Sequence, residues 1–330
     1  PSLFSDSAVN PCLPNNSTVL FFKTVLQSLK NYHNAAGVPL KHIHVGGEDS
    51  PPPAWLGSIH CRNLLPLEQE DLYLEIKVNY SMAIGDIAEK EGVKLIALDE
   101  FYIAWPSRLP FERIRPFMTP FRRTRFPAEN NFFDTISISK TFDQLPQGHR
   151  AQHMADNDYK VILQPDDYFS LDFAAEPNPN MPGAYNERRR YINATRIFNF
   201  LPDNLCCNYQ LSDEGSFGCA DVNNCLELVN RSNVLGMQAT LGTRYVKDAS
   251  ILFKLLAPRI IAYAERAWHK APWEDTYKVH PMRFSPQTGP QIDIQTPDLD
   301  SRDKDWVRVA SIIGHKEYKR MLGVAMPEIP

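Results

Sequence analysis

The chain has no uninterrupted apolar run of about 18 residues, the length that would indicate a membrane-spanning helix. It also has no excess of basic residues, because 35 Lys and Arg stand against 39 Asp and Glu and the formal net charge is −4. Proteins that bind nucleic acid through its phosphates are usually basic. We therefore expect neither a membrane span nor a nucleic-acid partner. No signal-peptide pattern follows Pro1, so we expect a mature or processed chain.

The cysteines lack the spacing of a metal site. No Cys-x-x-Cys pair occurs, and the loop at 203–225, which holds four of the six cysteines, contains no histidine. An even number of cysteines, with four of them crowded into a loop rich in Asn, Asp, Ser and Gly, favours disulfides in an oxidising compartment. We expect no metal and no cofactor. The six are Cys12, Cys61, Cys206, Cys207, Cys219 and Cys225.

Asn-x-Ser/Thr sequences also indicate a secretory route, because they are the acceptors of N-linked glycans. There are more of them than we expect by accident in a chain of this length, and they begin at Asn15, Asn16, Asn79, Asn193 and Asn230. We expect a secreted, extracellular glycoprotein, with a lysosomal or vesicle lumen as the alternative. The pairing of the last four cysteines, and which sequons carry glycans, stay open.

Hydrophobic patterning alternates between helices and strands. Apolar residues at helical spacing predict a helix at 18–35, capped by Ser17 or Thr18, a second at 68–91, and a third that begins at Asp248 and bends at Pro258. Short apolar runs predict strands at 41–46, 93–98, 131–136, 159–163 and 234–241. This alternation predicts an α/β fold with a parallel sheet, and 330 residues with 43% hydrophobic content are enough for a large core.

A closed (β/α)8 barrel needs eight strands, and the pattern contains five. We therefore expect residues 1–330 to be the C-terminal portion of one TIM-barrel domain, carrying about strands 4–8. An open remnant would expose two sheet edges. A second polypeptide is expected to supply strands 1–3, packed along the strands at 41–46 and 234–241.

Two adjacent carboxylates follow the first predicted strand. Glu48 and Asp49 come directly after the glycine pair Gly46-Gly47, at the C-terminal end of the strand, which is the end that carries the chemistry in α/β barrels. Neighbouring acids there can divide acid catalysis and charge stabilisation between them. A solvated acidic turn is the alternative.

A proline- and arginine-rich segment at 102–130 excludes regular structure and predicts a long loop after a strand. Its arginines are candidates for binding sulfate or carboxylate groups, because guanidinium forks match such anions. They are Arg108, Arg113, Arg115, Arg122, Arg123 and Arg125. A solvated loop or a processing site around 122–125 is the alternative.

Several motifs together resemble the chitobiase branch of glycoside hydrolase family 20, the β-N-acetylhexosaminidases, nearly from end to end. The most specific is Ala-Glu-Arg-Ala-Trp-His at 264–269, within a longer match over 258–274. The others are Ser7–Leu13, His44 with the Gly-Gly-acid-acid run, Tyr168 with Leu171–Phe173, and Lys304–Trp306. The resemblance implies a disulfide between Cys12 and Cys61.

The resemblance also implies substrate-assisted hydrolysis, in which the sugar's own 2-acetamido oxygen attacks C1. An Asp-Glu pair serves this reaction in the family, but here the order is reversed. Glu48 falls at the position that orients the acetamido group, and Asp49 at the position of the proton donor. Tyr168 aligns with a tyrosine on a later strand that binds the acetamido oxygen.

The aligned sugar pocket departs from the family pattern. Leu98, Phe133 and Gly242 align with pocket tryptophans, and Arg244 aligns with a glutamate that binds sugar hydroxyls. His44, Asp172 and Tyr168 stand as the pattern expects. Each lost aromatic wall removes stacking surface for a sugar ring.

We therefore predict a hexosaminidase-like protein whose catalysis is strongly reduced or absent and whose role is binding, structure or storage. The alternative is an active exo-β-N-acetylhexosaminidase that releases terminal N-acetylglucosamine or N-acetylgalactosamine. The second polypeptide is expected to be the N-terminal part of the same precursor. A glycan ligand and a higher oligomer stay open.

Overall fold

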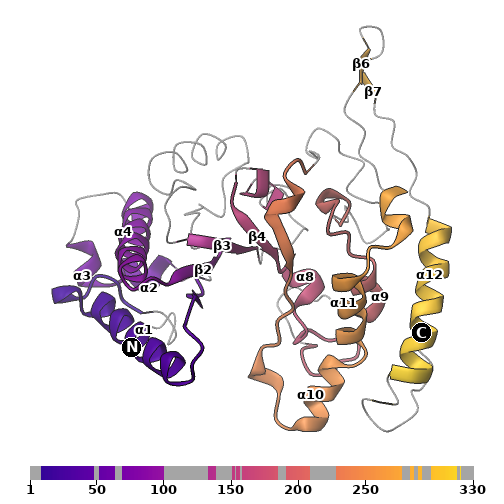
Figure 1. Ribbon diagram of the computed structural model, residues 1–330, viewed down its shortest axis with the longest axis horizontal. Helices are drawn as coiled ribbons and strands as arrows, with labels where there is room; N and C mark the ends of the chain where they lie inside the picture. Colours follow the sequence, from indigo (N-terminus) through magenta and orange to yellow (C-terminus); the bar gives the residue numbers. More distant parts are fainter. Residues whose placement is uncertain are drawn as a thin grey trace. The chain divides into compact units, whose positions relative to one another are not determined.

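The computed structural model divides the chain into two compact units, which are Pro1–Ser137 with Asn157–Lys160, and Ile138–Asp156 with Val161–Pro330 (Figure 1). Each unit has its own parallel strands. The structure describes residues 9–47, 52–63, 69–99, 133–138, 151–152, 154–156, 158–184, 191–208, 228–276, 283–285, 289–291, 299–317 and 320.

The first unit is a βαβ arrangement, and its strands run parallel in the order β1-β2-β3. Its elements are η1 (Pro14–Asn16), α1 (Ser17–Ala35), β1 (His42–His44), α2 (Pro52–Leu56), α3 (Ile59–Arg62), α4 (Gln69–Lys90), β2 (Lys94–Leu98) and β3 (Phe133–Ile138). The three strands predicted for this part of the chain are confirmed within a few residues.

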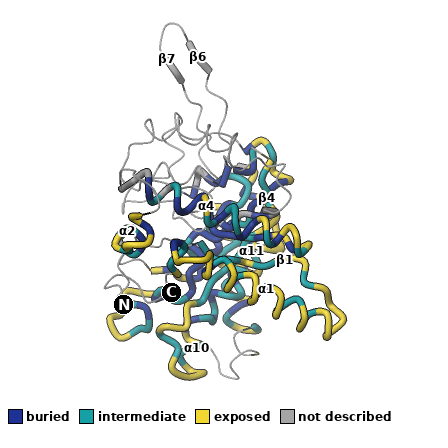
Figure 2. Tube along the Cα trace, turned by 90° about the vertical axis from the view of Figure 1, so that its left-hand side faces the viewer, coloured by how far each residue is buried: buried dark blue, intermediate teal, exposed yellow. Residues whose placement is uncertain are grey.

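The two long helices of the first unit differ in how much of their apolar face they bury. On α4, the predicted stripe is in the core, with Leu72 3%, Ile76 4% and Ile84 1% exposed. On α1, Leu26 is buried, but much of the predicted apolar face is exposed (Figure 2). The helix also begins differently from the prediction, because Asn16 takes the N-cap position in place of Ser17 or Thr18.

The second unit holds a parallel pair of strands, β4 and β5, with helices that follow them. Its elements are β4 (Lys160–Leu163), α8 (Asp166–Phe169), α9 (Ala194–Phe198), η2 (Leu205–Asn208), η4 (Arg231–Asn233), β5 (Val234–Met237), η5 (Thr243–Tyr245), α10 (Ala249–Leu256), α11 (Arg259–Trp268), η6 (Pro272–Thr276), β6 (Arg283–Ser285), β7 (Gly289–Gln291), α12 (Leu299–Ile312) and η7 (Ile313–Glu317). Both predicted strands are confirmed, and β6 and β7 form an antiparallel hairpin.

Local chemistry explains where the helices α10 and α11 begin. The carboxylate of Asp248 accepts a hydrogen bond from the amide of Ile251 at 2.9 Å, so the predicted helix start at Asp248 is confirmed as an N-cap. The helix stops before Pro258, and α11 begins at Arg259. Among the described residues, no helix is both long and apolar enough to cross a membrane.

A disulfide joins Cys12 to Cys61, as the resemblance implied. Both cysteines lie in a small buried cluster with Trp55, Leu72 and Ile76. The bond therefore fastens the start of the described chain to the core beside α4. The side chains of the other four cysteines lie outside the described residues, and their pairing stays a prediction.

Replacing Cys61 with serine is expected to lower the free energy of unfolding by about 4 kcal/mol, because the bond closes a loop with a sequence separation of 49 residues. Denaturant unfolding of both proteins measures the loss. The exposed change Ser28→Ala on α1 is the control, and equal stability of Cys61→Ser and wild type would contradict the prediction.

Candidate functional site

The acid pair Glu48-Asp49 and the arginine-rich loop at 102–130 lie outside the described residues. Phe133 is placed as a residue of β3, without a described side chain. The roles predicted for these residues stay predictions. The remaining candidates fall in two places, the ends of β1 and β2 in the first unit and the segment after β4 and β5 in the second.

In the first unit, hydrogen bonds bring the ends of β1 and β2 together. The amide of Val45 donates to the carbonyl of Ile96 at 2.9 Å, and the amide of Leu98 donates to the carbonyl of Gly46 at 2.8 Å. Leu98, only 8% exposed, therefore lies beside the glycine that precedes the acid pair by two residues. Leu98, a candidate wall of the sugar pocket, therefore lies next to the backbone segment that leads into Glu48 and Asp49.

His44 shares this strand end. Its Nδ1 atom accepts a hydrogen bond from the amide of Gly46 at 3.1 Å, which requires an unprotonated Nδ1. Burial lowers the pKa of His44 below its usual value. Both effects favour a neutral imidazole whose remaining N–H group is available as a donor.

In the second unit, Gly242 lies close to the side chain of Asp172. A Cβ atom added to Gly242 would lie 2.9 Å from Oδ2 of Asp172. The backbone of Gly242 has φ −67° and ψ 133°, a conformation open to any residue. The backbone therefore accepts a larger residue here, and such a residue would displace the carboxylate of Asp172. Arg244 lies two residues further on in η5, with its guanidinium 5.7 Å from the ring centroid of Tyr245.

Tyr168 lies beyond the strand that ends at Leu163. It lies in the short helix α8, and the strand-like pairing occurs two residues later, where Ser170 bridges Thr240. Its ring is 4% exposed, packs edge-on against Phe200 and lies under the guanidinium of Arg196. Its hydroxyl donates to the carbonyl of Asn208 at 2.7 Å. A hydroxyl has one proton, so donation to an acetamido oxygen would require this bond to break.

Arg259 was not recognised as a site residue from the sequence, although it lies in the matched segment. Its side chain is fully buried and donates to four backbone carbonyls, and that of Phe173 lies 2.7 Å away. The other acceptors are Leu171, Ile192 and Leu255. Burial lowers the pKa of Arg259 to about 10, and the nearby Asp172 carboxylate opposes this shift. The guanidinium thus fixes the loop that carries Asp172.

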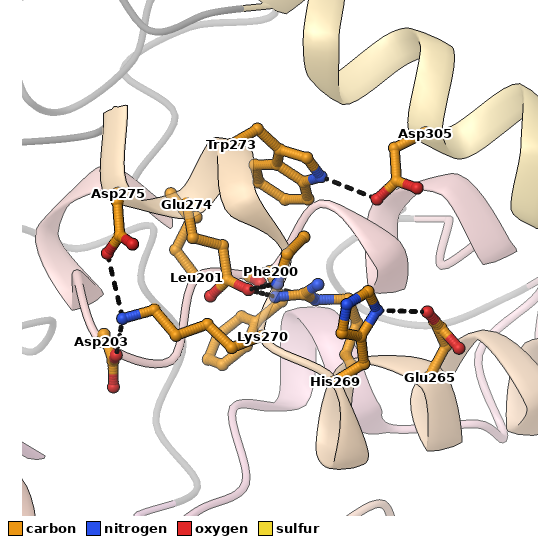
Figure 3. Close-up of polar contacts among 12 residues, drawn as sticks. Phe200, Leu201, Asp203, Glu265, His269, Lys270, Trp273, Glu274, Asp275 and Asp305 are labelled. Atoms are coloured by element: carbon orange, nitrogen blue, oxygen red, sulfur yellow. Dashed lines mark hydrogen bonds and ion pairs between the residues drawn. The ribbon is translucent and has the colours of Figure 1, made fainter.

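Arg266 of the specific motif belongs to a second buried group, together with Trp273 and Glu274 from the longer match. Arg266 and Glu274 make an ion pair whose side chains are 0% and 3% exposed. The Arg266 guanidinium lies 5.1 Å from the ring centroid of Trp273, and the indole N–H of Trp273 donates to Asp305 on α12 at 3.1 Å (Figure 3). These contacts join α11, η6 and α12, so the motif supports the fold of this unit.

Charged residues surround this group at the surface. Figure 3 shows Lys270 between Asp203 and Asp275, at 3.1 and 3.0 Å, and His269 bonded to Glu265 at 2.8 Å. Each pair is substantially exposed, so each contributes little to stability. No cluster of three His, Cys, Asp or Glu side chains that could hold a metal occurs within the described part of the chain.

The model of the glycosyl hydrolase family 20 catalytic domain matches residues 4–271. The chain belongs to this family. A beta-hexosaminidase-type protein of Pinctada maxima is 28% identical over 335 residues, which cover 96% of this chain and 29% of that relative. The beta-hexosaminidase of Vibrio vulnificus is 24% identical over 326 residues, with 96% and 35% covered.

Solved structures of family 20 show the fold. The β-N-acetylhexosaminidase of Streptomyces coelicolor A3(2) superposes with a TM-score of 0.54 at 16% identity, over 96% of this chain and 44% of that one. The fold is the (β/α)8 TIM barrel, and the described residues carry five of its parallel strands. The chain spans about a third of the length of the curated relatives it matches.

Replacing Arg259 with methionine is expected to lower the free energy of unfolding by about 3 to 5 kcal/mol, because four buried carbonyls and the Asp172 charge lose their partner. Arg259→Lys should lose less, since an ammonium keeps the charge but not the fork. Denaturant titration is the measurement.

The matched control is Arg231→Met. Arg231 forms an exposed ion pair with Asp203, so its loss is expected to cost less than about 1 kcal/mol. Similar losses for Arg259→Met and Arg231→Met would show that the buried guanidinium is not needed.

Proposed function

We propose that this chain is part of a secreted hexosaminidase-like protein of family 20 whose glycosidase activity is strongly reduced or absent. The observation that carries the proposal is the absence of a side chain at Gly242, next to the Asp172 carboxylate. The resemblance puts a tryptophan of the sugar pocket at position 242, where this chain has a glycine, and a Cβ at this position would lie 2.9 Å from Oδ2 of Asp172. A sugar ring in the pocket therefore finds no aromatic side chain at position 242 against which to stack.

The acid pair supports the same proposal. Asp49 at the proton-donor position has one methylene fewer than glutamate, which withdraws the acid by about 1.5 Å, and misplacement of about 1 Å can cost on the order of 10²-fold in rate. Tyr168 adds to this, because its hydroxyl already donates to Asn208. The proton donor Asp49 and the acetamido ligand Tyr168 thus both depart from what substrate-assisted catalysis requires.

The role left for such a barrel is binding of a glycan, structure or storage. The alternative is an active exo-β-N-acetylhexosaminidase, the activity named for the relatives from Vibrio and Streptomyces. In that case Asp49 would act as the acid, Glu48 would orient the acetamido group and Tyr168 would bind it.

The expected result with a chromogenic N-acetyl-β-glucosaminide, at acid and neutral pH, is turnover far below the ordinary enzymatic range of about 1 to 10³ s⁻¹. The double variant Glu48→Asp/Asp49→Glu restores the family order and is expected to raise any residual rate. Asp49→Ala is the control for background hydrolysis. Turnover by wild type in the ordinary range would exclude the proposal in favour of the active enzyme.

Secretion and glycosylation belong to the same proposal. The disulfide between Cys12 and Cys61 fits an oxidising compartment. Asn79 and Asn193 are exposed, so their sequons can carry glycans in the folded protein. Asn230 is less suited, because its side-chain amide donates to the carbonyl of Asp156 at 3.4 Å.

We also propose that a second polypeptide, the N-terminal part of the same precursor, supplies barrel strands 1–3. Exposed apolar residues support this. In the first unit, Phe21 is 63% and Tyr32 73% exposed on α1, and the residues of the following strand β1 are not buried. In the second unit, Leu235 on β5 is 55% exposed. Barrel strands are normally covered on both faces, so these surfaces require a partner.

Residues 1–330 expressed alone are therefore expected to self-associate on gel filtration and to exchange the amide hydrogens of α1 and β1 rapidly. Addition of the N-terminal polypeptide should give one defined complex in which these amides are protected. A compact, soluble, well-protected monomer of residues 1–330 would contradict the proposal.

A further inference from the structure

Two opposite charges follow neighbouring parallel strands of the second unit. The amide of Leu171 donates to the carbonyl of Thr240 at 2.7 Å, so the segments after β4 and β5 still run side by side at this point. Asp172 and Arg244 come shortly afterwards, beyond the carboxyl ends of β4 and β5. Parallel α/β sheets bind their ligands at this end of the strands. The two side chains therefore lie where a ligand is expected.

The backbone at Asp172 is held from two sides. Arg259 donates to the carbonyls of Leu171 and Phe173, the residues on either side of Asp172. Gly183 packs so closely that a Cβ atom added to it would lie 2.0 Å from the carbonyl oxygen of Asp172. The main chain that carries this carboxylate is therefore fixed before any ligand binds, which lowers the entropy lost on binding.

The carboxylate of Asp172 lies beside a position that has no side chain. A Cβ atom added to Gly242 would lie 2.9 Å from Oδ2 of Asp172. Gly242 is exposed and Asp172 is half-buried. A ligand can therefore approach the carboxylate through the space that a larger residue at position 242 would fill.

Arg244 supplies the positive charge, two residues beyond Gly242. The residue is exposed, and its guanidinium lies 5.7 Å from the ring centroid of Tyr245. Contact with an aromatic ring leaves the N–H groups of a guanidinium able to donate in their own plane. Two of these donors match two oxygens of a sulfate or carboxylate group.

The two charges are not used up by other side chains. Among the described residues, neither the Asp172 carboxylate nor the Arg244 guanidinium makes an ion pair or a side-chain hydrogen bond. Arg259 lies near Asp172, but its hydrogen bonds go to backbone carbonyls. A hydrogen-bond acceptor and a charged donor are thus both available at the same end of the strands.

We propose that Asp172 and Arg244 together select a sugar that carries an anionic group, either sulfate or carboxylate. This inference rests on the proposed glycan-binding role and adds the chemical class of the ligand. Asp172 accepts hydrogen bonds from sugar hydroxyls, and Arg244 binds the anion with two N–H groups. The glutamate that the resemblance puts at position 244 would accept hydrogen bonds and repel an anion. Arginine at this position therefore reverses the charge that the site prefers.

The test is titration calorimetry of the complete protein with N-acetylglucosamine, N-acetylglucosamine 6-sulfate and glucuronic acid. At least one of the two anionic sugars is expected to bind about tenfold more tightly than N-acetylglucosamine, the equivalent of one hydrogen bond to a charged group. Which of the two binds more tightly distinguishes sulfate from carboxylate as the source of the charge. Equal affinity for all three sugars would overturn the inference.

Variants assign the preference to Arg244. Arg244→Gln is expected to bind the three sugars within about twofold of one another, because an amide lacks the charge that distinguishes them. Lys247→Gln is the matched control, since Lys247 is an exposed cation of the same loop, and it should keep the wild-type preference. Asp172→Asn should bind N-acetylglucosamine about fivefold more weakly, because a charged acceptor is lost. An Arg244→Gln protein that keeps the preference would overturn the inference.

Further outcomes separate this inference from the proposed function. If inorganic sulfate binds as tightly as the sulfated sugar, Arg244 holds a free anion and the inference is overturned. If none of the three sugars binds, the glycan-binding role and the inference both fail, whereas equal binding overturns the inference alone. If the protein hydrolyses the chromogenic glycoside at an ordinary rate but shows the expected preference, the reduced activity is wrong and the inference stands.

Discussion

The second unit depends on one buried guanidinium. Transfer of an arginine side chain out of water costs several kcal/mol, and Arg259 offsets this cost with four carbonyl acceptors and the nearby Asp172 carboxylate. Because its donors have a fixed planar geometry, the segments at 171–173, 192 and 255 cannot shift independently. The position of Asp172, and with it the space left at Gly242, follows from this constraint.

The longer match at 258–274 contains a second buried charged group with a structural role of a similar kind. The ion pair of Arg266 and Glu274 is buried among aromatic rings and connects α11 to η6, while Trp273 reaches α12. These contacts are needed for the fold whether or not a sugar is cleaved. Family membership and catalytic activity are therefore separate questions here, and the second depends on the acid pair and on the walls of the pocket.

The sequence predicted the strands well because each is a short apolar run, and it predicted α4 well because its apolar stripe is buried. It predicted α1 as a helix but did not reveal how much of its apolar face is exposed, since periodicity records which residues share a face and not what covers it. Tyr168 aligns with a strand tyrosine of the family, and in this chain it lies in α8, two residues before the bridge at Ser170. The role of Arg259 depends on carbonyls from segments distant in sequence, which no local pattern shows.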